Sequence, residues 1–240
     1  MHISYYVPDE IRHNADLMDR FEFDQAFLDD KIGVRRRHIA SSSQATSDLC
    51  VAAAEALSRE APGYDPESID TVLLCTQNPD FRLPHTSAVL QKGLGLSTGI
   101  ACFDINLGCS GYVYGLSVIK GLLQTGTSRN LLFFTCDPYS KALDPDDRNT
   151  ILLFGDAAAV TWVRSDDLEQ GFRIGEFDLG TDGEFFESLI VESGGARNPL
   201  TRDADEETWE GHNYRMDGRN IYRYMIRCVP ESVTRCLEKN

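Results

Sequence analysis

Cys109 is the residue of this sequence that is best placed for chemistry. It lies in Leu107-Gly108-Cys109-Ser110-Gly111, after the apolar run 101–106 and before apolar residues at helical spacing from Tyr112 to Leu123. This pattern predicts a strand, a tight turn and a buried helix. Unpaired N–H groups and the positive end of the helix dipole favour a thiolate at such a turn, and a thiolate is a nucleophile. A small buried cysteine in a core turn fits the same pattern, so both interpretations stay open here.

Length and composition indicate an ordinary globular protein. The 240 residues are 42% hydrophobic and 25% charged, which is enough for one large core or two small domains. No apolar stretch is as long as a membrane span, and the N-terminus lacks a basic segment followed by an apolar one. We therefore expect a soluble protein of the cytoplasm with no membrane contact. The net charge of -15 disfavours nucleic-acid binding.

The cysteines do not form a recognisable framework. There are seven of them, no two are spaced as Cys-x-x-Cys, and most lie inside apolar runs. The set therefore predicts neither disulfides nor a metal site. The cysteines are Cys50, Cys75, Cys102, Cys109, Cys136, Cys228 and Cys236.

Two basic groups are exceptions in an acidic sequence. One is Lys31 with the run 35–37, and the other is Arg219, Arg223 and Arg227 at four-residue spacing. The second group falls on one face of a predicted helix. Such a stripe is either an ordinary solvated face or a docking strip for an anionic partner, and the pattern alone allows both.

Helical and extended segments alternate through the first two thirds of the sequence. We predict helices over 46–58, 84–93 and 112–126, the first of them capped by Thr46 or Ser47. We predict extended segments over 71–76, 101–106, 130–135, 151–154 and 157–163. This alternation is typical of a layered α/β fold. Between the last two segments, Asp156 is expected to bind buried backbone donors rather than to act in catalysis.

The pattern changes after about residue 165. Segments 172–179 and 184–192 are predicted to be antiparallel strands joined by a turn at 181–183. A polar, acidic loop is expected over 193–213, followed by the arginine-striped helix. That helix also has a wide apolar face, and we expect this face to be exposed because no further strand follows in the sequence.

Five segments form an ordered set of motifs along the sequence: 32–40, 78–84, 104–116, 147–159 and 216–222. In order and spacing they resemble β-ketoacyl-(acyl-carrier-protein) synthase III, a condensing enzyme of the thiolase fold. The segment 104–116 around Cys109 closely resembles the active-cysteine segment of that family. Residues 32–40 resemble its "TGIRERHIA" element, and residues 78–84 resemble its substrate loop. Residues 147–159 resemble its "DR…FGDGAGA" signature, and residues 216–222 resemble its "MDGREVF" helix start.

The resemblance implies a thiolase-like layered α-β-α-β-α fold with an incomplete second half. The N-terminal half with the nucleophile would span 1–165, and 166–240 would begin the C-terminal half. The sequence ends before the family's "HQAN" and "HGNTSAA" elements, which carry its catalytic His and Asn. We therefore expect acyl transfer to be better supported in this chain than condensation.

The function implied is transfer of an acyl group from acyl-CoA to Cys109 and condensation with malonyl-acyl carrier protein, in fatty-acid or polyketide-type synthesis. Coenzyme A would be a substrate rather than a bound cofactor, and the resemblance implies a homodimer. The alternatives are a non-condensing acyltransferase of specialised metabolism and a noncatalytic fragment or partner subunit. A cysteine protease is disfavoured, because 109–112 does not match the papain-type pattern.

The resemblance also assigns residues to coenzyme A. Phe27 falls where the family stacks an aromatic ring on adenine, Lys31 where an arginine meets phosphate, and Arg148 where a second residue flanks the adenine. Gly218 and Tyr222 fall at further coenzyme A positions. A core aromatic that packs with Phe23 on one helical face is the alternative for Phe27.

Two further roles follow from the same resemblance. Leu83 falls where the family inserts a side chain across the dimer interface into the partner's acyl pocket. Arg219, Arg223 and Arg227 would dock the acyl carrier protein.

Overall fold

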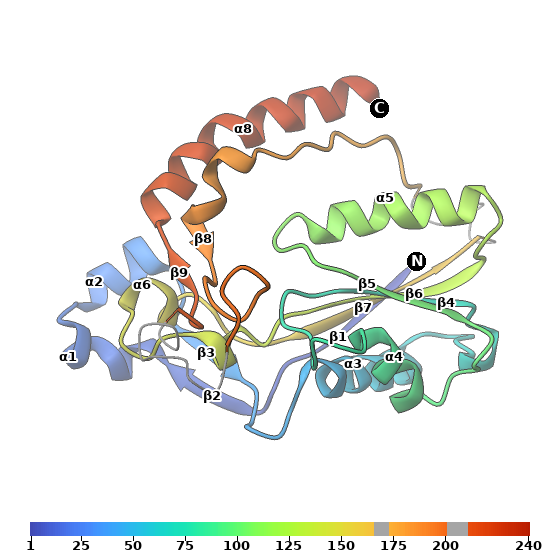
Figure 1. Cartoon of the computed structure of the whole chain (residues 1–240), viewed down its shortest axis with the longest axis horizontal. Helices are drawn as coiled ribbons and strands as arrows, with labels where there is room; N and C mark the ends of the chain where they lie inside the picture. The colour runs from blue at the N-terminus through green and yellow to red at the C-terminus, as the bar shows by residue number, and fades with distance from the viewer. Residues whose placement is uncertain (166–172, 201–210) are drawn as a thin grey trace. The chain divides into compact units, whose positions relative to one another are not determined.

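The computed structural model describes residues 1–165, 173–200 and 211–240, and its internal contacts divide the chain into two compact units (Figure 1). The first unit comprises Met1–Arg12, His38–Pro138 and Gly155–Ile174. The second comprises His13–Arg37, Tyr139–Phe154 and Gly175–Asn240. The chain passes between the units several times. The division at residue 165, which follows the halves of the family, stays a prediction.

The first unit is built around a five-stranded mixed sheet with the order β1-β7-β6-β4-β5. Its strands are β1 (His2–Tyr6), β4 (Thr71–Cys75), β5 (Ala101–Ile105), β6 (Asn130–Cys136) and β7 (Ala158–Arg164). Strand β4 pairs in parallel with β5 and β6, whereas β7 is antiparallel to β6 and to β1. The continuous apolar runs of β4 and β6 fit their buried positions inside the sheet. The predicted strands 71–76, 101–106, 130–135 and 157–163 are thereby confirmed.

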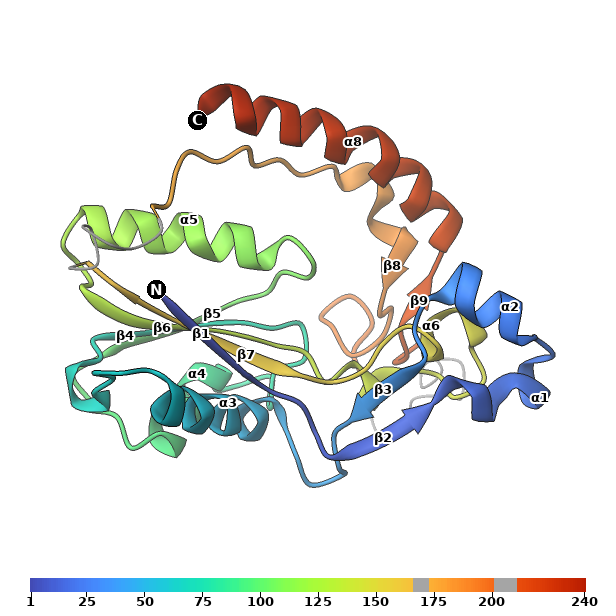
Figure 2. The same ribbon diagram turned by 180° about the vertical axis from the view of Figure 1, so that it is seen from behind.

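Helices cover both faces of this sheet (Figures 1 and 2). Helices α3 (Thr46–Glu60) and α4 (Thr86–Gly93) lie on one face, and α5 (Gly111–Gln124) lies on the other. Successive strand residues point to opposite faces, so Val72 packs in the core with α3 while Leu73 packs in the core with α5. The α/β class and the three predicted helices are confirmed.

The N-terminus of α3 differs from the prediction by one residue. Its N-cap is Ala45, whose backbone N–H donates to the carboxylate of Asp48 at 2.7 Å. Thr46 and Ser47, the predicted caps, make tertiary contacts instead: the Thr46 hydroxyl donates to Asn78 O, and the Ser47 N–H donates to Asp80 Oδ1 at 3.0 Å. The hydroxyl and amide groups that could have capped the helix locally are therefore bonded to residues far away in the sequence.

Asp156 has the structural role that was predicted for it. Its carboxylate accepts the backbone N–H of Ala40 at 2.7 Å, and its own N–H donates to His38 O at 2.8 Å. The side chain is buried, so these bonds fix the chain just before β7.

In its described residues, the second unit consists of short helices, one small sheet and one long helix. The short helices are Asn14–Leu17, α1 (Met18–Phe21), α2 (Gln25–Phe27), the π-helical turn Leu28–Ile32, Tyr139–Ala142, α6 (Arg148–Ile151) and Gly183–Ser188. Strands β8 (Leu189–Ile190) and β9 (Arg215–Met216) pair antiparallel, and α8 spans Gly218–Lys239. A separate two-stranded sheet joins β2 (Glu10–His13) and β3 (Arg36–Ile39).

The predicted extended segment 151–154 is wrong. Residues 148–151 form α6, because the Asp147 carboxylate accepts the Asn149 N–H at 2.9 Å and the Thr150 hydroxyl at 2.8 Å. The apolar residues that suggested a strand therefore follow a capped helical turn.

The predicted strands over 172–179 and 184–192 are also wrong. Residues 173–182 have no regular structure, 183–188 are helical, and only Leu189–Ile190 form a strand. The backbone of Glu176 bonds to the side chain of Asn240 rather than to a neighbouring strand: its N–H donates to Oδ1 at 2.7 Å, and its carbonyl accepts from Nδ2 at 3.1 Å. Residue 172 and the part 201–210 of the predicted loop lie outside the described residues.

The predicted arginine-striped helix is present as α8. Its apolar residues Tyr222, Ile226 and Leu237 are exposed, as expected. No helix within residues 1–165, 173–200 and 211–240 combines the length and the apolar character needed to cross a bilayer.

Asp178 fastens the irregular segment before β8 to α8. Its carboxylate accepts hydrogen bonds from Arg235 Nη2 at 2.9 Å, Lys239 Nζ at 2.8 Å and Ser232 Oγ at 2.8 Å. These donors, with Arg235 the strongest, hold the pKa of Asp178 well below its usual value.

This contact should make the stability of the folded chain depend on pH in the acid range. A carboxyl group whose pKa is lower in the folded state stabilises that state at every pH above its pKa in the unfolded chain, which is about 3.9 for Asp. This stabilisation is lost as the pH falls below about 3.9 toward the folded-state pKa. The urea midpoint should therefore fall more steeply between pH 6 and pH 3 in the parent chain than in Asp178→Asn. The control is Glu238→Gln, which also removes one negative charge but at an exposed position of α8. Equal slopes for the parent and Asp178→Asn would contradict the expectation.

Candidate active site

Cys109 lies at the turn between β5 and α5, immediately before the N-terminus of the helix. The Gly111 N–H donates to Gly108 O at 2.8 Å, which closes the turn, and the Tyr114 N–H donates to Ser110 O at 3.1 Å, which begins the helix. Within the described ranges, the Cys109 amide donates to no backbone oxygen. That amide is therefore available to bind an oxygen that develops negative charge beside the sulfur.

The glycine at 111 is required by space. A Cβ at this position would lie 2.2 Å from Cys75 Sγ, at the end of β4, and 3.2 Å from Leu107 Cβ. No side chain fits between the start of α5 and the sheet at this point. The predicted strand, turn and helix are thus confirmed, with close approach as the reason for the second glycine. The helix is not buried all round, because only Gly111, Gly115 and Ile119 of α5 are buried.

Exposure separates Cys109 from the other cysteines. All seven belong to the described part of the chain, and Cys109 alone among them is exposed. Burial raises the pKa of Cys75 to about 11 and raises the pKa of Cys102, in each case with help from a nearby carboxylate. The pKa of Cys136 is raised by its hydrogen bond with Cys50 and by burial. Since Cys109 is exposed, the interpretation as a small core residue does not hold.

A groove in the second unit brings together most of the residues assigned to coenzyme A. Its volume is about 500 Å³, and its lining includes Phe27, Lys31, Arg148 and Gly218. Tyr222, the fifth residue assigned by resemblance, is not part of the lining. The sequence did not indicate a ligand role for the other lining residues, which are Ile32, Asn149, Leu153, Met216 and Asp217. Arg219 also lines the groove, although the resemblance assigns it to carrier-protein docking.

Phe27 and Arg148 form a flat pair at the edge of this groove. The guanidinium carbon of Arg148 lies 5.3 Å from the centre of the Phe27 ring, and its Nη1 donates to Phe21 O at 3.3 Å. Phe27 is half-buried in α2, and its N–H donates to the capping carboxylate of Asp24 at 2.8 Å. An aromatic face beside a guanidinium is a suitable surface for a planar ring.

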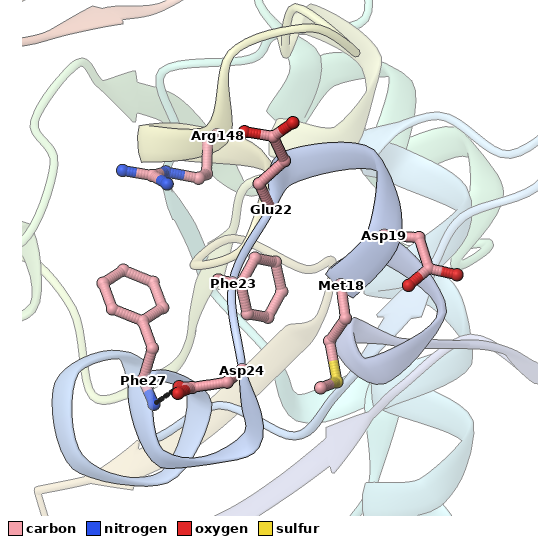
Figure 3. Close-up of a pocket in the computed structure, with 7 residues that line it drawn as sticks. All are labelled: Met18, Asp19, Glu22, Phe23, Asp24, Phe27 and Arg148. Atoms are coloured by element: carbon pink, nitrogen blue, oxygen red, sulfur yellow. Dashed lines mark hydrogen bonds between the residues drawn. The ribbon is translucent and has the colours of Figure 1, made fainter.

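Figure 3 shows the cleft of about 570 Å³ that adjoins this pair, with Phe23, Phe27 and Arg148 around it. The Phe23 ring centre is 5.6 Å from that of Phe27. Phe23 precedes α2 instead of lying one helical turn away from Phe27, so the predicted shared helical face is wrong. Phe27 is also no core aromatic, because it is half-buried and lines both the cleft and the groove.

The N-terminus of α8 faces the same groove. Asp217 caps the helix by accepting the Asn220 N–H at 3.0 Å, and Gly218 is the first helical residue. Lys31, Arg148 and Arg219 add three cationic side chains to the lining. A helix N-terminus with several cations is well suited to a phosphate-containing ligand.

The predicted arginine stripe is divided by this geometry. Arg219 lines the groove, whereas Arg223 and Arg227 are exposed farther along α8 and are not part of the lining. The four-residue spacing could not distinguish them, because the position of Arg219 in the first turn of α8 decides what it reaches.

Leu83 lies in the loop between β4 and α4 and is 87% exposed. Phe81 in the same loop is 57% exposed. The first unit therefore does not enclose these side chains itself.

Known proteins match the chain along almost its whole length. The model of the family 3-oxoacyl-(acyl-carrier-protein) synthase III matches residues 103–183, which include Cys109 and Arg148. A β-ketoacyl-(acyl-carrier-protein) synthase III from Caldanaerobacter subterraneus subsp. tengcongensis is 32% identical over 98% of this chain and 69% of its own length. One from Roseiflexus castenholzii is 38% identical over 92% of this chain and 65% of its own.

A solved structure gives the same result. The crystal structure of a 3-oxoacyl-(acyl-carrier-protein) synthase III superposes with a TM-score of 0.88 at 34% identity, over 99% of this chain and 72% of the other. The chain thus spans about two thirds of the length of these relatives. The likeness in sequence and structure confirms the thiolase-like fold and the resemblance found around Cys109. This chain therefore belongs to the β-ketoacyl-(acyl-carrier-protein) synthase III family.

Proposed function

We propose that this protein accepts an acyl group from acyl-CoA on Cys109. The observation that carries the proposal is the exposed Cys109 on a closed turn at the N-terminus of the 14-residue helix α5. In the reaction the Cys109 thiolate attacks the thioester carbonyl carbon, and the carbonyl oxygen becomes an oxyanion that the Cys109 N–H binds. The bond from carbon to the coenzyme A sulfur then breaks, and coenzyme A leaves as a thiolate that takes up a proton.

The groove of the second unit is the proposed binding site for the nucleotide part of acyl-CoA. Phe27 and Arg148 offer a flat surface for adenine. The N-terminus of α8, with Lys31 and Arg219, offers positive charge and N–H groups to the phosphates. We assign Arg219 to the phosphates rather than to the carrier protein, because it lines the groove. Tyr222 keeps only the assignment that the resemblance gives it.

The second step proposed is condensation: the malonyl group on acyl carrier protein loses CO2, its carbon attacks the carbonyl of the Cys109 thioester, and the Cys109 thiolate leaves. The relatives are named as β-ketoacyl-(acyl-carrier-protein) synthases, which supports this step. Arg223 and Arg227 are the proposed docking residues, since both are exposed cations on one helix of an acidic protein. The product is proposed to serve fatty-acid or polyketide-type synthesis.

We further propose that the protein works as a homodimer in the cytoplasm. The 87% exposure of Leu83 supports a role for this side chain in the acyl pocket of a second copy. Seven free cysteines support a reducing compartment.

Variants of the groove test the proposed binding site. Arg219→Ala and Arg148→Ala should each raise the acyl-CoA concentration that half-saturates Cys109 acylation, on the order of tenfold. Arg219→Ala loses a charge-assisted contact with phosphate, and Arg148→Ala loses one side of the adenine surface. Arg223→Ala is the matched control, because it removes the same charge one turn farther along α8 and should change acyl-CoA saturation less than twofold. The measurement is the acylation rate by quenched-flow mass spectrometry over a range of acyl-CoA concentrations. An unchanged half-saturation in Arg219→Ala, with an increase in Arg223→Ala, would reverse the assignment of the two residues.

A further inference from the structure

The end of strand β4 supports the turn that carries Cys109. Cys75 is the last residue of β4 and is 4% exposed. Its Sγ donates a hydrogen bond to the carbonyl of Leu107 at 3.1 Å. Because burial and the charge of Asp137 raise the pKa of Cys75 to about 11, its sulfur keeps its proton at neutral pH and remains a donor.

The same sulfur also contacts the other end of the turn. It fills the space beside Gly111, where a Cβ would come within 2.2 Å of it. Leu107 lies two residues before Cys109 and Gly111 lies two residues after it. A single buried side chain therefore meets the turn on both sides of the nucleophile.

A carboxylate from the neighbouring strand holds the residues that follow Cys75. Asp137 comes directly after β6, which pairs in parallel with β4, so both strands end at the same edge of the sheet. Its Oδ1 accepts hydrogen bonds from the Gln77 N–H at 2.7 Å, from the Thr76 hydroxyl at 3.1 Å and from Asn78 Nδ2 at 3.1 Å. Three donors on one carboxylate oxygen leave the segment 76–78 little freedom.

The segment 76–78 provides a further contact with the turn that carries Cys109. The side chain of Gln77 packs against Gly108, where a Cβ would lie 2.7 Å from Gln77 Oε1. The turn is therefore supported at Gly108 as well as at Leu107 and Gly111. All of these groups belong to the first unit.

We propose that Cys75 is a positioning residue for acyl transfer: its thiol, bonded to Leu107 O and packed against Gly111, holds the turn so that the Cys109 N–H and sulfur meet the thioester together. Asp137 supports the same turn through Gln77. The inference rests on the proposed function, in which Cys109 is the nucleophile. Its chemical consequence is specific, because acyl transfer needs an oxyanion donor at a fixed position, whereas alkylation by iodoacetamide displaces iodide and needs none.

The test compares these two reactions of Cys109 in one set of variants. In Cys75→Ala the acylation rate with acetyl-CoA should fall on the order of tenfold, with unchanged half-saturation, since a small displacement of reacting groups is costly in rate. The alkylation rate with iodoacetamide should stay within about twofold, because alkylation depends on the thiolate alone. Cys75→Ser, whose hydroxyl can still donate to Leu107 O, should recover most of the acylation rate.

Controls distinguish positioning from general damage to the fold. Cys102→Ala truncates a partly buried cysteine on the neighbouring strand of the same sheet and should leave both rates unchanged. Equal loss of acylation and alkylation in Cys75→Ala would overturn the inference, since the turn would then be disrupted rather than misaligned. An unchanged acylation rate in Cys75→Ala would also overturn it. If Cys109 of the parent chain is alkylated but never acylated, the proposed function itself fails and the inference fails with it.

Discussion

Replacing Cys109 by alanine should abolish the one acyl adduct that this chain forms with acyl-CoA. The expected parent result is a single mass increase equal to one acyl group, located on the peptide that contains Cys109. Cys109 alone combines exposure, a closed turn and the N-terminus of a helix of 14 residues. Intact-protein mass spectrometry followed by peptide mapping makes the measurement.

The other cysteines of the sheet provide the matched controls. With a pKa of about 11, Cys75 is a thiolate in roughly one molecule in ten thousand at pH 7, so it cannot compete as a nucleophile. The pKa values of Cys102 and Cys136 are raised as well. Cys102→Ala and Cys136→Ala should therefore keep the adduct. An adduct that persists in Cys109→Ala and maps to one of these residues would refute the assignment of the nucleophile.

Adding one methyl group to helix α5 should have opposite effects at its two interior glycines. In Gly115→Ala the new Cβ would lie 2.1 Å from Phe133 Cζ and within 2.8 Å of two further ring atoms. Phe133 is 1% exposed and its ring stacks on Tyr112 with centres 5.4 Å apart, so the ring has no space to move into. We expect a loss of unfolding free energy of about 3 kcal/mol, at the upper end for overpacked cores.

Gly121→Ala is the matched control in the same helix, because nothing lies within 4 Å of the added Cβ. Alanine is the better helix former, so this variant should gain roughly 0.5–1 kcal/mol. Urea unfolding of both variants and the parent gives the comparison. Similar stability changes in the two variants would mean that α5 does not pack on β6 through Gly115.

Local patterns in the sequence were sufficient for the central sheet and for the turn with Cys109. The runs 72–75 and 131–134 are apolar at every position because their strands are covered on both faces, and that requirement is visible without a structure. The glycines around Cys109 likewise reflect a backbone that passes close to β4. The ordered motifs that resemble the synthase family placed Phe27, Lys31, Arg148 and Gly218 in one site, and these four residues do line one groove.

Patterns failed where partners lie far apart in the sequence. The segment 173–179 belongs to a predicted strand, but the side chain of Asn240 binds the backbone of Glu176, and no spacing rule connects two residues 64 positions apart. The same limit explains the arginine stripe. A helical repeat shows that Arg219 and Arg223 share a face of α8. Only the packing around the first turn shows that, of these two residues, Arg219 lines the groove and Arg223 does not.

What the sequence by itself determined was the turn that carries Cys109, the layered α/β fold and the family, because each depends on residues that are neighbours or are spaced regularly. The tertiary structure alone decided how the turn with Cys109 is held. Cys75 bonds to Leu107 and Asp137 bonds to Gln77 across 32 and 60 positions of the chain. Such contacts are set by which strand ends meet at one edge of the sheet, and this depends on the order of all its strands rather than on any one segment.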